Sequence, residues 1–294
     1  MTTALLIALL ILLYSLQSLF CKFFSERYPG DATDSSTVYT VFYGLIVALL
    51  TFAVNGFSFH AGWLTVVLAL LNAVMLVTYN MSLIGASARG SYSIVMICML
   101  FGGILVPLAE STLIFDTKLN PWQFSAIGLM LVSFVFLNWD GIKGNGKRPP
   151  KLFYIFCLLL FFSNGIYGAL LDIPQKLQNG EKNELVILTF LFAGILSAVI
   201  LAVQKKRRFV ACMKQTKWSA LFLVSCCLIA TFAVNLYVYC LSLIDVSILS
   251  ALDNGGVLLL SVLFSCFFFH EKIKPAKAVG ILLSLGSIVI LNIF

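Results

Sequence analysis

The chain is 294 residues long, and 61% of its residues are hydrophobic while only 11% are charged. Soluble globular domains are nearer half apolar and a quarter charged, so this composition excludes most soluble folds, disordered chains, nucleic-acid modules and secreted disulfide scaffolds. A helix that crosses a bilayer needs about 20 apolar residues, and ten such helices would occupy roughly two thirds of this length. The chain is therefore expected to lie almost entirely in a membrane.

The first apolar run begins at the N-terminus with the sequence MTTALLIALLILLYSLQSLF. A signal peptide would carry basic residues before its apolar run and small residues at a cleavage site. This segment has neither, and it is long enough to span a bilayer. It is therefore predicted to be a retained first helix.

Ten apolar segments close to bilayer length follow one another along the chain. Backbone groups in lipid must bond within their own segment, so each segment is predicted to be a helix. The short alternating segments of a membrane barrel are absent. The predicted fold class is an all-α polytopic membrane protein with ten transmembrane helices. Their predicted bounds are 2–23, 36–56, 62–84, 88–109, 121–139, 152–172, 184–203, 217–241, 246–269 and 276–293.

The two halves of the sequence resemble each other. The four residues Met81–Ile84 (MSLI) recur as Leu241–Ile244 (LSLI), and further identities in the same order extend through three consecutive helices. Because each half holds an odd number of helices, the second copy would insert upside down. We therefore predict two inverted five-helix repeats, 1–148 and 149–294.

The basic residues are distributed unevenly between the two sides of the predicted bundle. If the N-terminus is external, sixteen of the nineteen Lys and Arg residues fall on the cytoplasmic side and three on the other. Basic loop residues favour the cytoplasm, so external termini are predicted. The QKKRR cluster at 204–208 is then expected to be an anchor beside anionic lipid.

Histidines and cysteines show no sign of a metal site. The eight cysteines form no CxxC pair, and the two histidines, His60 and His270, lie at the edges of apolar runs. Cysteines inside apolar runs usually pack as small hydrophobic side chains. We predict no metal, no cofactor and no catalytic residue.

Together these features resemble the drug/metabolite transporter superfamily, in particular its ten-helix EamA-like permeases. The most local marker is Phe-His-Glu-Lys-Ile-Lys-Pro, ending at Pro275, which is similar to the acidic turn between the last two helices of that family. A stretched counterpart begins at Glu110. The first helix lacks the Trp-Gly pair of many members, and the charge bias departs from their commonly cytoplasmic termini. The resemblance implies a secondary transporter that moves small metabolites or drugs, commonly outward.

Asp253 is the acid that we single out as functional. It lies about seven residues into the ninth segment and borders a polar face. A charged side chain at the bilayer centre costs about 2.5–3.5 kcal/mol on insertion scales, so such residues usually serve a site or a water path. We predict that Asp253 titrates or binds a cation. The bordering face carries Ser247, Ser250, Asn254, Ser261 and Ser265, for which helix packing is the alternative interpretation.

Polar residues on four other segments are predicted to line the same cavity near the midplane. Their hydrogen-bonding tips suit polar metabolites, and aromatic faces can hold an ammonium group. Glu110 and Glu271, in contrast, are predicted to be interfacial and structural. A kink is predicted at Pro107. The cavity candidates are Tyr14, Gln17, Asn72, Tyr79, Asn164, Tyr167, Asn235 and Tyr239.

The predicted function is a secondary-active transporter of small metabolites or drugs, working by alternating access around this cavity. The alternative is a membrane-embedded enzyme acting on lipid-linked substrates, which would need clustered catalytic groups near an interface. A third hypothesis is that the protein is a nonenzymatic membrane scaffold. The expected partners are a small-molecule substrate and the lipid bilayer of the cell membrane, with no nucleic acid. Monomer and homodimer both remain open.

Overall fold

The structure is a computed structural model that describes residues 2–28, 32–87, 89–90, 92–137, 139, 150–177, 181–204, 217–269 and 275–293. This part of the chain forms ten α-helices and contains no strand, which confirms the predicted all-α class. The helices are α1 (Thr2–Arg27), α2 (Ala32–Val54), α3 (Trp63–Ser87), α4 (Tyr92–Ala109), α5 (Pro121–Leu137), α7 (Lys151–Lys176), α8 (Lys182–Gln204), α10 (Lys217–Leu241), α11 (Val246–Phe269) and α12 (Pro275–Ile293).

Hydropathy and helix length agree with membrane insertion. Among the described residues, seven helices have the length and apolar composition needed to cross a bilayer. The other three carry shorter apolar stretches, Pro121–Leu137, Val246–Leu260 and Pro275–Leu291. The predicted bounds of α10 and α11 match the structure, whereas α7 continues to Lys176, beyond the predicted end at residue 172.

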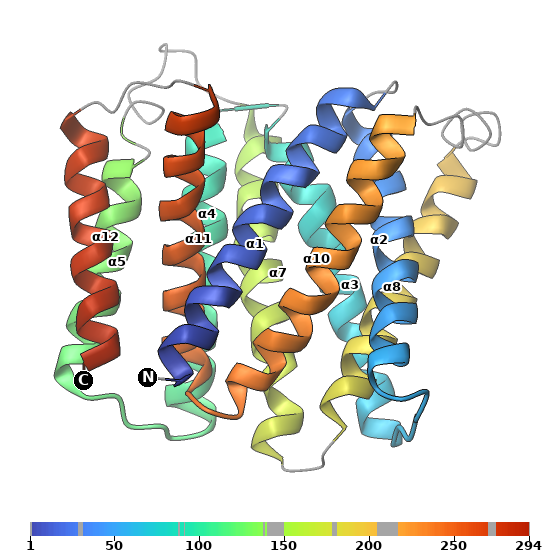
Figure 1. The fold of residues 1–294 in the computed structure, drawn as a ribbon, viewed down its shortest axis with the longest axis horizontal. Helices are drawn as coiled ribbons and strands as arrows, with labels where there is room; N and C mark the ends of the chain where they lie inside the picture. Colours follow the sequence, from blue (N-terminus) through green and yellow to red (C-terminus); the bar gives the residue numbers. More distant parts are fainter. Residues whose placement is uncertain are drawn as a thin grey trace.

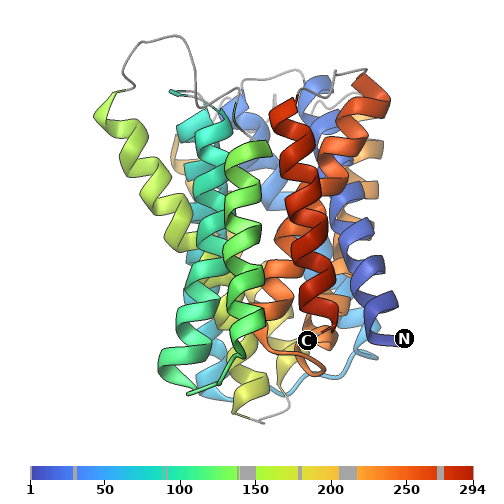
Figure 2. The ribbon, with the colours of Figure 1, turned by 90° about the vertical axis from the view of Figure 1, so that its left-hand side faces the viewer.

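The helices run side by side as one bundle, and both ends of the chain lie at the same end of it (Figures 1 and 2). We call this end the terminus side. The connections from α2 to α3, from α4 to α5 and from α10 to α11 also lie there, as do the end of α7 and the beginning of α8 (Figure 1). The polar connectors 140–149 and 205–216 lie outside the described residues.

Helices from the two halves of the chain pack against one another in matched pairs. α1 packs along α10 and α3 along α7, while α2 packs against α8 and α5 against α12. Glycines allow the closest approaches. A Cβ atom on Gly44 of α2 would lie 2.7 Å from the backbone nitrogen of Gly194 on α8. The bundle core is therefore an interface between the two halves of the sequence.

The end of α4 departs from regular α-helix. Pro107 lies inside α4, and the chain widens three residues later into a π-helical turn, η1 (Glu110–Ile114). Proline removes a helical hydrogen bond, and π turns occur often at functional sites. This turn sets the position of Glu110, whose side chain is only 7% exposed. The turn directs Glu110 into the bundle, and its predicted position at the membrane interface stays a prediction.

Candidate functional site

Four tyrosines and an aspartate from five helices lie close together in the bundle. We call Tyr14, Tyr43, Tyr167, Tyr237 and Asp253 the central polar group. Asp253 is near enough to the hydroxyls of Tyr14 and Tyr237 to interact electrostatically with both. Tyr167 interacts in the same way with Tyr14, Tyr43 and Tyr237. The rings of Tyr14 and Tyr237 meet edge to face with their centroids 6.4 Å apart.

Hydrogen bonds attach neighbouring side chains to this group. The Gln17 amide donates to the Tyr43 hydroxyl over 3.2 Å. The hydroxyls of Tyr237 and Ser250 are hydrogen bonded at 3.3 Å, which ties α10 to α11. Gln17 and Ser250 are predicted site residues, whereas their partners Tyr43 and Tyr237 are not.

Asn164 and Asn254, both predicted site residues, approach each other across Gly103 of α4. A Cβ atom on Gly103 would lie 2.6 Å from Asn164 Nδ2 and 3.0 Å from Asn254 Oδ1. Asn164 donates to the carbonyl of Met99 at 2.8 Å, and Asn254 to that of Ser250 at 2.8 Å. A glycine at position 103 therefore makes room for two amides from α7 and α11.

Several buried polar atoms have no hydrogen-bond partner in the described part of the chain. They include Gln17 Oε1, Asp253 Oδ1 and both side-chain polar atoms of Asn72. Leaving such an atom unsatisfied costs about 1–3 kcal/mol, and buried polar groups in folded proteins nearly always bond to protein or water. The free oxygens of Gln17 and Asp253 are therefore suited to bind water or a polar ligand.

Two predicted residues on α10 face away from the central polar group. Asn235 donates to the Thr51 hydroxyl of α2 at 3.1 Å, so its stripe forms part of the α2 interface. Tyr239 lies on the same stripe and is 50% exposed. Tyr237, which projects from the opposite face of α10, is 6% exposed and takes the place predicted for Tyr239. Apolar neighbours surround Tyr237 in the sequence, so no polar pattern marks it.

Two further predicted residues, Asn72 and Tyr79, lie on α3. Tyr79 donates to the sulfur of Met99 at 3.1 Å and interacts electrostatically with Tyr167, at the border of the central polar group. Asn72 is fully buried. Ser247 bonds to Asp245, whereas the side chains of Ser261 and Ser265, and all of Glu271, lie outside the described residues.

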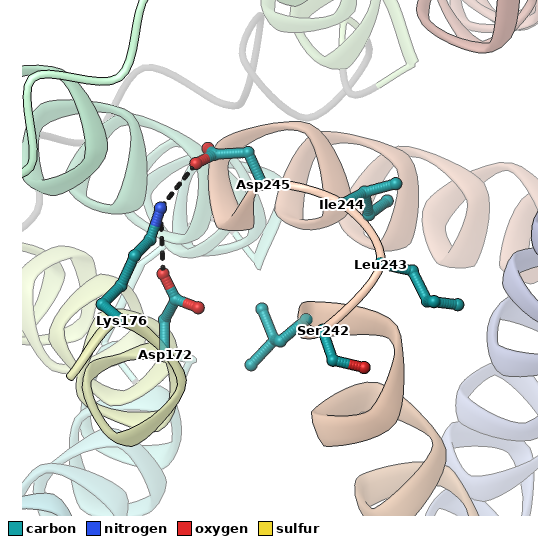
Figure 3. A pocket seen from close by; sticks show the side chains of 7 residues that line it. Asp172, Lys176, Ser242, Leu243, Ile244 and Asp245 are labelled. Atoms are coloured by element: carbon teal, nitrogen blue, oxygen red, sulfur yellow. Dashed lines mark hydrogen bonds and ion pairs between the residues drawn. The ribbon is translucent and has the colours of Figure 1, made fainter. Parts of the chain in front are cut away.

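A second polar cluster lies at the terminus side, and the sequence analysis did not foresee it. We call Glu110, Asp172, Lys176 and Asp245 the acid cluster. The Lys176 ammonium lies 2.9 Å from Asp245 Oδ2 and 3.7 Å from Asp172 Oδ2 (Figure 3). The Ser111 hydroxyl lies 2.7 Å from each oxygen of Asp245. Asp172 is 1% exposed, so it is more deeply buried than Asp253, whose exposure is intermediate.

The ion pair between Lys176 and Asp245 is stabilised in its charged form. Burial raises the pKa of Asp245, but hydrogen bonds from Ser247, Lys176 and Ser111 outweigh it and lower that pKa below its ordinary value. Burial lowers the pKa of Lys176, but its hydrogen bond to Asp245 and the nearby carboxylates raise that pKa overall. Both groups are therefore charged at neutral pH.

A pocket of about 360 Å³ opens beside this pair (Figure 3). Its walls combine charged and apolar groups from the end of α7 and the turn between α10 and α11. Tyr237 of the central polar group also interacts electrostatically with Asp172 of the acid cluster. The residues that line the pocket are Asp172, Lys176, Leu241, Ser242, Leu243, Ile244 and Asp245.

Comparisons with known proteins address the family and the fold. Residues 151–293 match the sequence model of the EamA-like transporter family. One protein crystal structure has a TM-score of 0.76 to this chain, with 17% sequence identity over 99% of this chain and 98% of that one. At this identity the likeness concerns the fold alone. No curated protein matches the sequence.

Proposed function

We propose that the protein is a secondary-active transporter of small metabolites or drugs, acting outward, in the cell membrane. The match of residues 151–293 to the EamA-like transporter family supports this proposal. The proposal includes the absence of catalytic activity. EamA-like proteins are transporters, and the described helices form a membrane-spanning bundle.

The observation that carries this function is the position of Asp253. Its carboxylate interacts electrostatically with Tyr14 and Tyr237, and one of its oxygens is buried without a hydrogen-bond partner among the described residues. A carboxylate inside a membrane bundle is costly unless a proton, a cation or water satisfies it. Asp253 is thus proposed to exchange a proton or a cationic substrate as the central polar group opens to either side.

The pairing of helices supports a repeat mechanism. α1 packs along α10, and the equivalent contact in the other half is α7 along α3. α2 and α5 each pack against their own counterparts, α8 and α12. We propose that 1–148 and 149–294 are inverted five-helix repeats. When the two repeats swap conformations, the substrate site would open to the opposite side of the membrane. Superposing α1 to α5 on α7 to α12 tests this, and parallel halves would refute it.

Flux into liposomes that contain the pure protein tests the transport function. Counterflow of amino acids, amines, nucleosides and sugars would identify a substrate. The variant Asp253→Asn keeps size and hydrogen bonding, so it should fold and remain monodisperse but lose gradient-driven flux and its pH dependence.

Asp116→Asn is the matched control for this variant. Asp116 is exposed and has φ of 51°, a conformation that asparagine tolerates. This control should transport like the unmodified protein. A D253N protein with unchanged flux and pH profile would show that the acid is structural, and no flux for any compound would reject the transport function.

A further inference from the structure

We propose that the pocket at the terminus side binds organic ammonium ions, at a site separate from the central polar group, and that the Lys176 ammonium is the resident occupant which an incoming amine displaces.

The charges of the acid cluster are unbalanced. Two carboxylates that line the pocket, Asp172 and Asp245, flank the single ammonium of Lys176, and a third, Glu110, interacts with it electrostatically. Asp172, which lines the pocket, is 1% exposed, and its Oδ2 has no hydrogen-bond partner in the described part of the chain. A buried carboxylate without a partner is unstable relative to one that is paired. The cluster therefore has the capacity for positive charge beyond that of Lys176.

Lys176 shows which kind of cation the cluster accepts. Its side chain is an alkylammonium, held 2.9 Å from Asp245, 3.7 Å from Asp172 and 5.5 Å from the ring centroid of Phe115. Carboxylates combined with an aromatic face are typical of organic ammonium recognition. Among the described residues no three His, Cys, Asp or Glu side chains are arranged to hold a metal ion.

The pocket has room for the carbon part of such a ligand. Its volume of about 360 Å³ lies in the range of small-molecule sites. Leu241, Leu243 and Ile244 contribute to its walls opposite the charged residues. Asp172 and Lys176 extend from α7 toward Asp245 at the beginning of α11, so a ligand in the pocket can reach the ion pair (Figure 3).

The inference concerns binding and stands whether or not the protein transports. Tyr237 of the central polar group interacts electrostatically with Asp172, which lines the pocket. Binding to the purified protein, measured without flux, separates this inference from the proposed function.

Calorimetric titration of the full-length protein in detergent with n-propylammonium chloride tests the site. n-Propanol controls for the alkyl group, and potassium chloride controls for ionic strength. The unmodified protein should show weak, saturable binding of n-propylammonium and no saturable response to either control. Lys176→Met removes the competing ammonium while keeping an unbranched side chain, so its affinity should rise by about tenfold or more, because a competitor lowers the observed affinity by the fraction of sites it fills.

Further variants locate the binding. Lys118 is an exposed lysine of the α4–α5 connection, and Lys118→Met should bind n-propylammonium like the unmodified protein. Adding Asp245→Asn to Lys176→Met should abolish the gain. If Lys176→Met does not fold, Asp172→Asn, which keeps the ion pair between Lys176 and Asp245, should bind several-fold more weakly than the unmodified protein. Absence of saturable binding to the unmodified protein, or an equal response to potassium chloride, would overturn the inference.

Discussion

Two tyrosines on α10 show how much depends on the direction of a single side chain. Tyr237 is buried, with its hydroxyl bonded to Ser250 and near Asp253, whereas Tyr239 is 50% exposed. Residues two positions apart on a helix point to nearly opposite faces. The two phenols therefore have different surroundings despite their identical chemistry.

Removing each hydroxyl in turn is a matched test of this difference. Tyr237→Phe deletes a buried hydrogen bond worth about 0.5–1.5 kcal/mol, so substrate flux should fall about two- to tenfold. Tyr239→Phe should leave flux unchanged, because its position is on the outer face of α10. Both would be measured as initial rates in liposomes at equal protein density. Equal loss in the two variants would place the transport path elsewhere.

The ion pair between Lys176 and Asp245 should contribute the same stability over a wide pH range. The lowered pKa of Asp245 means that its contribution is present above the unfolded value of about 3.9 and is lost as pH falls through the lower folded value. The raised pKa of Lys176 means that its contribution is present below about 10.4 and is lost as pH rises through the folded value.

Thermal unfolding can check this pH range. The difference in Tm between the unmodified protein and Lys176→Met should be larger at pH 8.5 than at pH 5.5. The reason is that Lys176 also interacts electrostatically with Glu110 and Asp172, which carry more negative charge at the higher pH. The flux of the unmodified protein should still change with pH through Asp253. An equal Tm difference at the two pH values would show that Lys176 contributes stability through Asp245 alone.

At the scale of elements, the crossing of α4 and α7 depends on glycine. A Cβ atom on Gly165 of α7 would lie 2.3 Å from the carbonyl oxygen of Gly102 and 2.4 Å from the Cβ of Val106. Small residues let membrane helices approach closely. The same approach brings Asn164 beside Gly103, so the crossing also positions a residue near the central polar group.

Gly165→Ala should destabilise the protein by about 1–3 kcal/mol, because backbone atoms must move to accept the added carbon. Gly128→Ala is the control, since nothing lies within 4 Å of a Cβ atom at that position on α5. It should be neutral or add up to about 1 kcal/mol through helix propensity. Thermal unfolding in the same detergent compares them. A stable Gly165→Ala protein would show that the two helices can separate freely.

At the scale of the whole molecule, both termini lie on one side of the bundle (Figure 2). The distribution of basic residues predicts that this side is external. Reporter fusions after residue 148 and after residue 210 should give cytoplasmic signals, and a fusion at Phe294 should give an external one. An external signal from either loop would show that the predicted orientation is wrong, while the fold would be unaffected.

The sequence by itself determined that the protein is an all-α membrane bundle and how its helices divide the chain. Lipid leaves only the helix as a way to satisfy the backbone, so hydropathy and length suffice for this step. The sequence also singled out Asp253, because a charged residue deep in an apolar segment can be recognised without knowing its neighbours in space. Its proposed role in transport stays a prediction.

Only the tertiary structure decided which polar side chains meet. Asn235 and Tyr239 form a regular stripe, yet Asn235 faces α2 and Tyr239 faces the surface. The sequence could not show this, because polar residues that join helices and polar residues that bind a ligand have the same spacing on a helix. Glu110, Asp172 and Lys176 stand at helix ends in the sequence, where charge is ordinary. The π turn after Pro107, the length of α7 and the turn before α11 bring them to Asp245. Contacts between distant segments depend on how the helices are rotated and packed, and no local pattern in the sequence carries that information.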